Sequence, residues 1–159
     1  MKQTIAVYPG SFDPPTNGHL DIISRASCIF SKVIVAVSDN STKNPSFSID
    51  DRFTMLKEAT KGMRGVETDI FSGLLVNYVR RKKATVIIRG LRAVSDFEYE
   101  FQMALMNRRL NKKIETVFLM PDESYTYISS SLIKQVARLG GTMEGLVPRS
   151  VERFLKEKK

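Results

Sequence analysis

The chain has 159 residues and a mass of 18.0 kDa, enough for one domain with a substantial hydrophobic core. Its single cysteine and single histidine exclude an internal disulfide and a structural zinc site, and no apolar run approaches the roughly 20 residues that cross a bilayer. The net charge of +8 favours polyanionic partners, and nucleotides or phosphorylated metabolites fit this charge as well as nucleic acid does. We therefore expect one cytoplasmic domain over residues 1–159, with no signal peptide and no membrane association.

Short runs rich in Val and Ile recur along the chain, which is typical of strands buried in a parallel sheet. They predict strands at 4–8, 33–38, 66–71, 85–89 and 116–120. Helical patterns fill the intervals, at 18–30, 49–60, 74–82, 95–110, 129–138 and 150–156. This alternation predicts an α/β fold: a single-domain, doubly wound (Rossmann-like) five-stranded parallel sheet with helices on both faces.

Several local patterns refine the helices. Ser48 has the side chain and the position of an N-cap for the second helix. In the fourth helix Phe97, Phe101 and Leu105 repeat at intervals of four residues, which predicts a buried stripe. The last helix carries no motif, and we expect it to contribute to packing.

Ligands of doubly wound sheets bind beyond the carboxyl ends of the strands, so the segments that follow the strands should meet at one rim. These segments supply hydroxyl groups, glycine backbone and the cations Lys43, Arg89 and Arg92. Two helix starts, at residues 16–19 and 128–134, add N–H groups of the kind that bind phosphate. The rim is thus predicted to bind a nucleotide, although the P-loop and the G-x-G-x-x-G turn are both absent.

Three blocks of sequence carry a family resemblance. Residues 8–14 (YPGSFDP) and 16–19 (TNGH) resemble the [TH]-x-G-H signature of the nucleotidyltransferase superfamily, and residues 128–131 (ISSS) with Lys134 resemble its ISSSxx[RK] signature. Between them, residues 88–100 (IRGLRAVSDFEYE) resemble the bacterial phosphopantetheine adenylyltransferase branch. The resemblance runs from about residue 4 to residue 140. The x-G-H block alone is a weak signal, but the three blocks in this order are specific.

The resemblance implies adenylyl transfer from ATP to 4′-phosphopantetheine, giving dephospho-CoA and pyrophosphate in the penultimate step of coenzyme A biosynthesis. The attacking phosphate oxygen is already anionic, so the reaction needs positioning and charge stabilisation and no general base. The resemblance also implies Mg²⁺ bound with ATP, assembly as a homohexamer and feedback inhibition by CoA. Nucleic acid is not an implied partner.

The matched motifs imply a role for individual residues. His19 is the implied transition-state stabiliser at the α-phosphate, and Ser11, Lys43 and Arg92 complete the implied catalytic set. Ser11, Lys43, Leu75 and Arg89 are implied to bind the acceptor. The implied ATP-binding residues are Ser11, Phe12, His19, Gly90, Leu91, Arg92, Glu100, Tyr125, Thr126, Tyr127, Ile128, Ser129, Ser130 and Ser131. No residue is implied to bind the metal directly.

Other functions remain open at this point. The same fold could serve another phosphorylated acceptor, of the nicotinamide mononucleotide or glycerol 3-phosphate type, although Lys43, Arg89 and block 90–100 favour phosphopantetheine. An RNA-binding module is suggested only by the charge, and the strands lack interleaved basic and aromatic residues. A nucleotide-binding regulator without catalysis is disfavoured by the intact His19.

Local alternatives stand beside the implied roles. His19 could merely cap its helix, and Glu100 could pair with a neighbouring charge. Leu75 could belong to the core, and the serines at 129–131 could form an ordinary helix cap.

Overall fold

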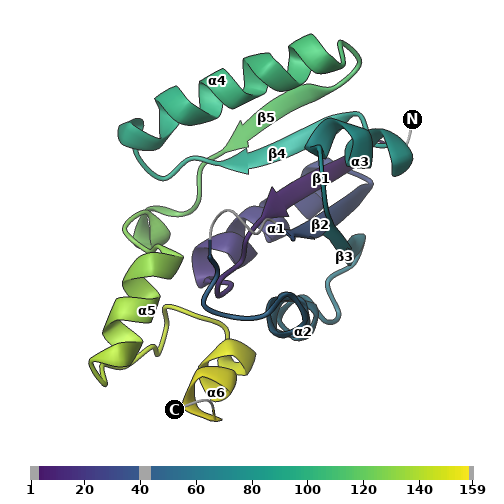
Figure 1. The fold of residues 1–159 in the computed structure, drawn as a ribbon. Helices are drawn as coiled ribbons and strands as arrows, with labels where there is room; N and C mark the ends of the chain where they lie inside the picture. Colours follow the sequence, from purple (N-terminus) through teal and green to yellow (C-terminus); the bar gives the residue numbers. More distant parts are fainter. Residues whose placement is uncertain (1–3, 40–43, 158–159) are drawn as a thin grey trace.

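A five-stranded parallel sheet forms the centre of the structure (Figure 1). The computed structural model describes residues 4–39 and 44–157. Its strands lie in the order β3-β2-β1-β4-β5, and every pairing is parallel. The strands are β1 (Ile5–Gly10), β2 (Lys32–Ser38), β3 (Val66–Phe71), β4 (Val86–Gly90) and β5 (Glu115–Leu119). The predicted fold class is confirmed.

Helices alternate with the strands as expected. They are α1 (Asn17–Ile29), α2 (Ile49–Ala59), α3 (Leu75–Arg81), α4 (Val94–Leu110), α5 (Ser130–Arg138) and α6 (Arg149–Glu157), and a 3-10 helix, η2 (Glu123–Tyr125), precedes α5. The hydroxyl of Ser48 accepts a hydrogen bond from the N–H of Asp51 at 3.1 Å, so the predicted N-cap of α2 is confirmed. Within residues 4–39 and 44–157, no helix is both long enough and apolar enough to cross a membrane.

The core has two layers because successive strand side chains point to opposite faces of the sheet. On one face, Ala6 and Val35 pack with Ile23 of α1 and Leu56 of α2. On the other face, the strands pack against α3 in a second cluster that includes Val7, Ile34, Ile87, Val76 and Val79. Burial on both faces explains why β2 is apolar at nearly every position.

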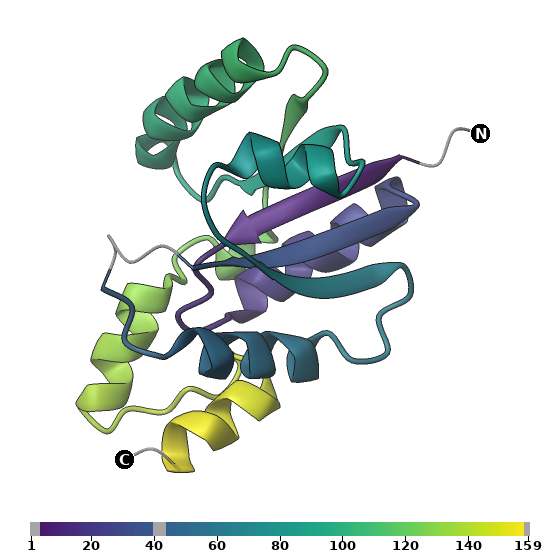
Figure 2. The ribbon, with the colours of Figure 1, turned by 45° about the vertical axis from the view of Figure 1, so that its right-hand side comes forward.

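The C-terminal helix closes a third cluster at one end of the sheet. Figure 2 shows α2, α5 and α6 grouped there, and Met55, Ile133 and Val151 are fully or almost fully buried between them. The segment just before α6 also holds the start of α1, because the N–H of Asn17 donates to the carbonyl of Leu146 at 2.9 Å. The expected packing role of the last helix is confirmed.

The predicted buried stripe on α4 is wrong. Phe97 and Phe101 are each 46% exposed and Leu105 is 48% exposed. Figure 1 shows the reason: α4 lies beside β5, the last strand of the sheet, so that protein packs against one side of the helix only. The apolar repeat identifies a face that is suited to burial, but this chain does not supply what would bury it.

Candidate active site

A cavity of about 670 Å³ opens at the carboxyl ends of β1 and β4. These two strands pair at Ala6–Val86 and Val7–Ile87, and their ladder ends after the second pair. The order of the strands reverses between β1 and β4, which is where doubly wound sheets bind their ligands. The predicted rim is therefore a real cavity.

Most of the implied site residues line this cavity. They are Ser11, Phe12, His19, Leu75, Arg89, Gly90, Arg92, Glu100, Tyr125, Ile128, Ser129, Ser130 and Ser131. Three implied ATP-binding residues lie off its wall: Leu91, Thr126 and Tyr127, the last of which is 64% exposed. Lys43 lies outside the described residues.

The start of α1 fixes the orientation of the His19 ring. Thr16 is the N-cap, and its N–H donates to Nδ1 of His19 at 3.0 Å. The Thr16 hydroxyl lies 3.1 Å from the same nitrogen and accepts from the N–H of His19 at 3.4 Å. This is a capping box in which histidine takes the place that glutamate or glutamine usually holds. His19 does cap its helix, but it does so with one nitrogen and leaves Nε2 for another partner.

The charge state of His19 follows from its surroundings. Burial, together with the positive charges of Arg92 and Arg89, lowers the pKa of His19 from 6.5 to about 4, and burial is the largest of these causes. The ring is therefore neutral at pH 7. Because Nδ1 accepts a hydrogen bond from the backbone, the one ring proton belongs on Nε2. His19 thus presents a neutral donor to the cavity.

The His19 ring packs against the aromatic ring of Phe12, which in turn packs against Tyr8. The Phe12 ring meets the His19 ring edge-on, with centroids 5.1 Å apart, and meets the Tyr8 ring in the same manner at 5.5 Å. Phe12 has a left-handed backbone, with φ of 47°, which turns its ring back under the loop. A Cβ on Gly10 would stand 2.9 Å from that ring, so the turn requires glycine there. Phe12 is 2% exposed, and most of its surface supports the site.

Arg89 and Glu100 form a two-pronged ion pair. Nε and Nη2 of Arg89 donate to the two carboxylate oxygens of Glu100, each at 2.6 Å. Nη1 donates to the carbonyl of Pro9 at 3.1 Å. A guanidinium has five N–H groups, so two of them remain for a ligand as far as the described residues go. The sequence analysis gave pairing with a neighbouring charge as the alternative role of Glu100, and the structure contains that pair.

The start of α5 offers fewer free hydroxyls than its sequence suggests. The Ser129 hydroxyl accepts from the N–H of Leu132 at 3.1 Å, and its own proton stays available to donate. The Ser130 hydroxyl donates to the carbonyl of Pro14 at 2.8 Å, so it has no proton left for a phosphate. Ser131 makes no side-chain hydrogen bond within the described part of the chain. The groups at this helix start that could donate to an anion are therefore the hydroxyls of Ser129 and Ser131 and the backbone N–H groups.

Two buried charges that the sequence analysis did not select hold the β1–α1 loop. Arg52 is 2% exposed, and its Nη1 donates to the carbonyls of Ser11 at 2.8 Å and Ser38 at 3.1 Å. Asp13 accepts from the N–H groups of Ser46 and Phe47, both at 3.0 Å, and pairs with Lys134 at 2.6 Å. A signal for Arg52 was present, because it lies on the same helical face as the packed residues of α2.

Comparison with known proteins agrees with this geometry. Residues 7–136 match the family described as Cytidylyltransferase-like. A curated phosphopantetheine adenylyltransferase of Desulfosudis oleivorans is 58% identical over 154 residues, covering 97% of this chain and 92% of the relative. Another, from Geotalea daltonii, is 57% identical and covers 99% and 98%. A crystal structure from Vibrio parahaemolyticus, named as a "Putative Nicotinate-nucleotide Adenylyltransferase", has a TM-score of 0.68 at 17% identity, covers 97% and 99%, and supports the fold.

The histidine of the first block and the serines of the third block face one cavity in this fold, and the class is therefore that of the nucleotidyltransferases. More narrowly, the identities of 58% and 57% extend over nearly the whole of both proteins. The chain belongs to the phosphopantetheine adenylyltransferases of the cytidylyltransferase-like family.

The neutral state of His19 can be tested by titration. Because the pKa of His19 is about 4 in the folded protein and 6.5 for an exposed histidine, as in the unfolded chain, the contribution of this group to stability is fully present above pH 6.5. That contribution is lost as the pH falls from 6.5 towards 4. We expect the ring resonances of this single histidine to titrate near pH 4 in NMR spectra. A midpoint near 6.5 would contradict the assignment.

The anchoring role of Arg52 can be tested by Arg52→Met. The substitution leaves the partly buried carbonyls of Phe47, Ser11 and Ser38 without this donor, and we expect a loss of about 3–5 kcal/mol in the free energy of unfolding, measured with urea. Arg153→Met is the matched control, because Arg153 makes an exposed ion pair with Glu58 and should lose less than about 1 kcal/mol. Equal losses in the two variants would show that Arg52 is not an anchor.

Proposed function

We propose that this nucleotidyltransferase moves the adenylyl group of ATP to 4′-phosphopantetheine and releases dephospho-CoA and pyrophosphate. The main support for this proposal is that a neutral His19 donor and the guanidiniums of Arg89 and Arg92 line the same cavity. The relatives at 58% and 57% identity carry the name of this activity. No comparison favours an acceptor of the nicotinamide mononucleotide or glycerol 3-phosphate type for this chain.

The proposed reaction forms one P–O bond and breaks another. A phosphate oxygen of 4′-phosphopantetheine attacks the α-phosphorus of ATP, the new P–O bond forms, and the bond to pyrophosphate breaks. No proton has to be removed from the attacking oxygen, so a site without a base is sufficient. Orienting the two reactants can contribute about 7–11 kcal/mol, and one donor aimed at the developing charge about 3–4 kcal/mol.

His19 supplies that donor through Nε2–H. Its capping hydrogen bond holds the ring before substrate arrives, so little reorganisation is needed during the reaction. A neutral ring also suits a cavity that already contains two guanidiniums, because a third positive charge there would be costly. Ser11 and Arg92 act with His19 in this proposal.

The two substrates occupy different sides of the cavity. The acceptor phosphate binds Arg89 through its two remaining N–H groups, and Ser11, Lys43 and Leu75 complete the acceptor side. ATP lies along Phe12, Gly90, Arg92, Tyr125 and residues 128–131, with its terminal phosphates at the start of α5. The other proposed ATP-binding residues, Leu91, Thr126 and Tyr127, adjoin these in the sequence and lie off the cavity wall. Glu100 acts on this site through Arg89, whose guanidinium it orients.

Magnesium fits this site as a companion of ATP. The carboxylates on the cavity wall are already paired: Asp13 with Lys134, Asp96 with Arg92, and Glu100 with Arg89. Within the described residues, no group of three or more acidic, histidine or cysteine side chains could hold a metal. Phosphate oxygens and water would therefore be its main ligands, and it would neutralise charge on the triphosphate. The chain's own donors, His19 and the start of α5, hold the phosphate oxygens.

We also propose that the chain assembles as a homohexamer through the face of α4. Phe97, Phe101, Leu105, Met106 and Leu110 are between 46% and 51% exposed along this one helix, which supports a subunit contact. CoA, which contains the acceptor as part of its structure, is the proposed feedback inhibitor on the acceptor side. A cytoplasmic location is consistent with the single free cysteine, Cys28.

The activity is tested by mixing the chain with ATP, Mg²⁺ and 4′-phosphopantetheine and measuring dephospho-CoA by mass spectrometry together with pyrophosphate release. His19→Ala should reduce turnover by about 100-fold or more, because it removes a donor used in the transition state. ATP affinity should change little. Nicotinamide mononucleotide and glycerol 3-phosphate serve as competing acceptors, and preferential use of either would refute the proposed acceptor. Near-normal turnover in His19→Ala would remove His19 from the mechanism.

The assembly is tested by light scattering on the wild-type chain and on Phe101→Glu. The wild type should have six times the 18.0 kDa chain mass, and a charge on the apolar face should give smaller species. Leu139→Glu is the matched control, because Leu139 is 81% exposed and lies outside α4, so that its variant should remain assembled. A wild-type chain of monomer mass would refute the hexamer.

A further inference from the structure

Tyr8 has a hydroxyl group that the fold does not use. Its side chain is 6% exposed, and its ring packs edge-on against Phe12. Yet no hydrogen bond reaches the hydroxyl from any part of the chain that the structure describes. Its oxygen is not among the fully enclosed side-chain atoms that lack a partner, so it is accessible, and the accessible space beside Tyr8 is the cavity. The residue lines the cavity, so a ligand can provide the missing partner.

The hydroxyl lies where β1 and β4 separate. A Cβ on Gly90 would stand 3.5 Å from this oxygen and 3.6 Å from a side-chain carbon of Ile22. Ile22 is a buried residue of α1 and offers no polar group. The hydroxyl therefore lies beside the backbone of Gly90, and both residues line the cavity.

The surrounding charges favour an oxygen-rich ligand. Arg89 and Arg92 are close enough to affect the hydroxyl, and neither has an acceptor to offer it. Burial raises the pKa of Tyr8 above its usual range, and Glu100 adds to that effect while Arg89 and Arg92 oppose it. The group stays protonated at pH 7 and can donate.

The nucleotide side of the cavity is the nearer one. Tyr8 belongs to the core cluster formed with α1, the helix that carries His19, and its ring lies 6.5 Å from the His19 ring between centroids. Leu75, on the proposed acceptor side, packs in the cluster on the opposite face of the sheet. The hydroxyl is thus on the same face as His19 and next to Gly90.

We propose that the Tyr8 hydroxyl donates a hydrogen bond to an oxygen of the bound nucleotide at its ribose–α-phosphate end and so holds the α-phosphate beside His19. This inference rests on the proposed function for the identity of the nucleotide. It adds Tyr8 to the ligand-binding residues of the site.

The test is Tyr8→Phe, which keeps the ring and removes only the hydroxyl. Calorimetric titration with ATP and Mg²⁺, in the absence of acceptor, should show binding about 10-fold weaker than in the wild type. The melting temperature should stay about the same, because the hydroxyl makes no hydrogen bond within the described residues. The Michaelis constant for 4′-phosphopantetheine should be unchanged.

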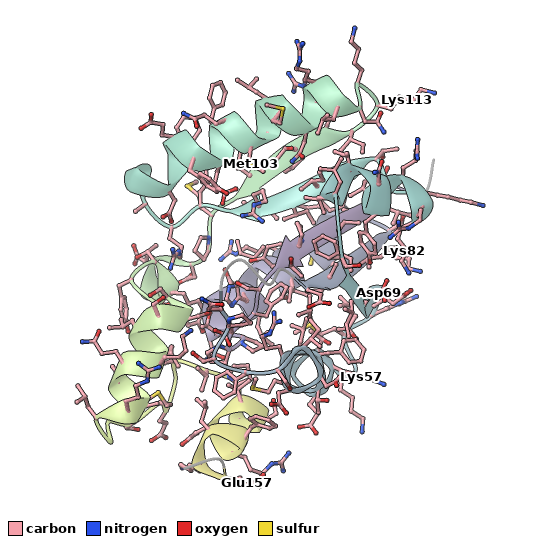
Figure 3. The ribbon with its side chains drawn as sticks, viewed as in Figure 1. Lys57, Asp69, Lys82, Met103, Lys113 and Glu157 are labelled. Carbon is pink, nitrogen blue, oxygen red and sulfur yellow. The ribbon has the colours of Figure 1, made fainter. Side chains whose placement is uncertain are left out.

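Tyr78→Phe is the matched control. The Tyr78 hydroxyl donates to Asp69 at 2.7 Å, and Lys82 binds the same carboxylate at 2.6 Å. Figure 3 shows Asp69 and Lys82 near each other and well apart from Met103, which lines the cavity. This variant should melt at a lower temperature and bind ATP normally. Unchanged ATP affinity in Tyr8→Phe, or a raised Michaelis constant for the acceptor alone, would overturn the inference.

The binding measurement also separates this inference from the proposed function. A wild-type chain that binds ATP without converting 4′-phosphopantetheine would refute the proposed acceptor, and weaker ATP binding by Tyr8→Phe would still support the role of the hydroxyl. A Tyr8→Phe variant that fails to fold would show that the hydroxyl is structural and would overturn the inference.

Discussion

The separation of β1 from β4 determines the position of the cavity and of the side chains that line it. Their pairing ends after Val7 and Ile87, and the residues that follow carry the chemistry. Tyr8, the β1–α1 loop and Arg89 all lie within a few residues of that point. Because the strands are parallel, the helix that leaves β1 also starts at this edge, which brings His19 to the same opening. One feature of strand pairing thus creates the space and delivers the groups around it.

The loop in that opening is held by charges and not by apolar packing alone. Arg52 binds its carbonyl at Ser11, and Asp13 joins it to residues 46–47 and to α5 through Lys134. Buried ion pairs add little net stability, but breaking one costs about 3–5 kcal/mol, so they select one arrangement over others. This suits a site whose proposed mechanism depends on placing donors, because a donor displaced by an ångström loses most of its effect.

The sequence predicted the strands, the helices and the rim because these depend on local periodicity and on helix starts. It could not decide how His19 is used, since the spacing from Thr16 fits both a cap and a ligand contact, and only the folded structure shows that the cap uses Nδ1. The Arg89–Glu100 pair joins residues 11 apart through the turn into α4, and its formation depends on the path of the chain. The prediction of a buried stripe on α4 was wrong for a different reason. The periodicity of a helix identifies an apolar face, but it does not show whether the surface that covers this face belongs to the same chain.

Helix α4 carries two features that are usually separate. Its apolar face is exposed, and from the same helix Glu100 holds Arg89 at the cavity. A subunit contact on that face would stiffen the helix that supports the guanidinium. Specific activity would then depend on protein concentration, falling on dilution as subunits part and Arg89 gains freedom, with no change in any residue that touches substrate.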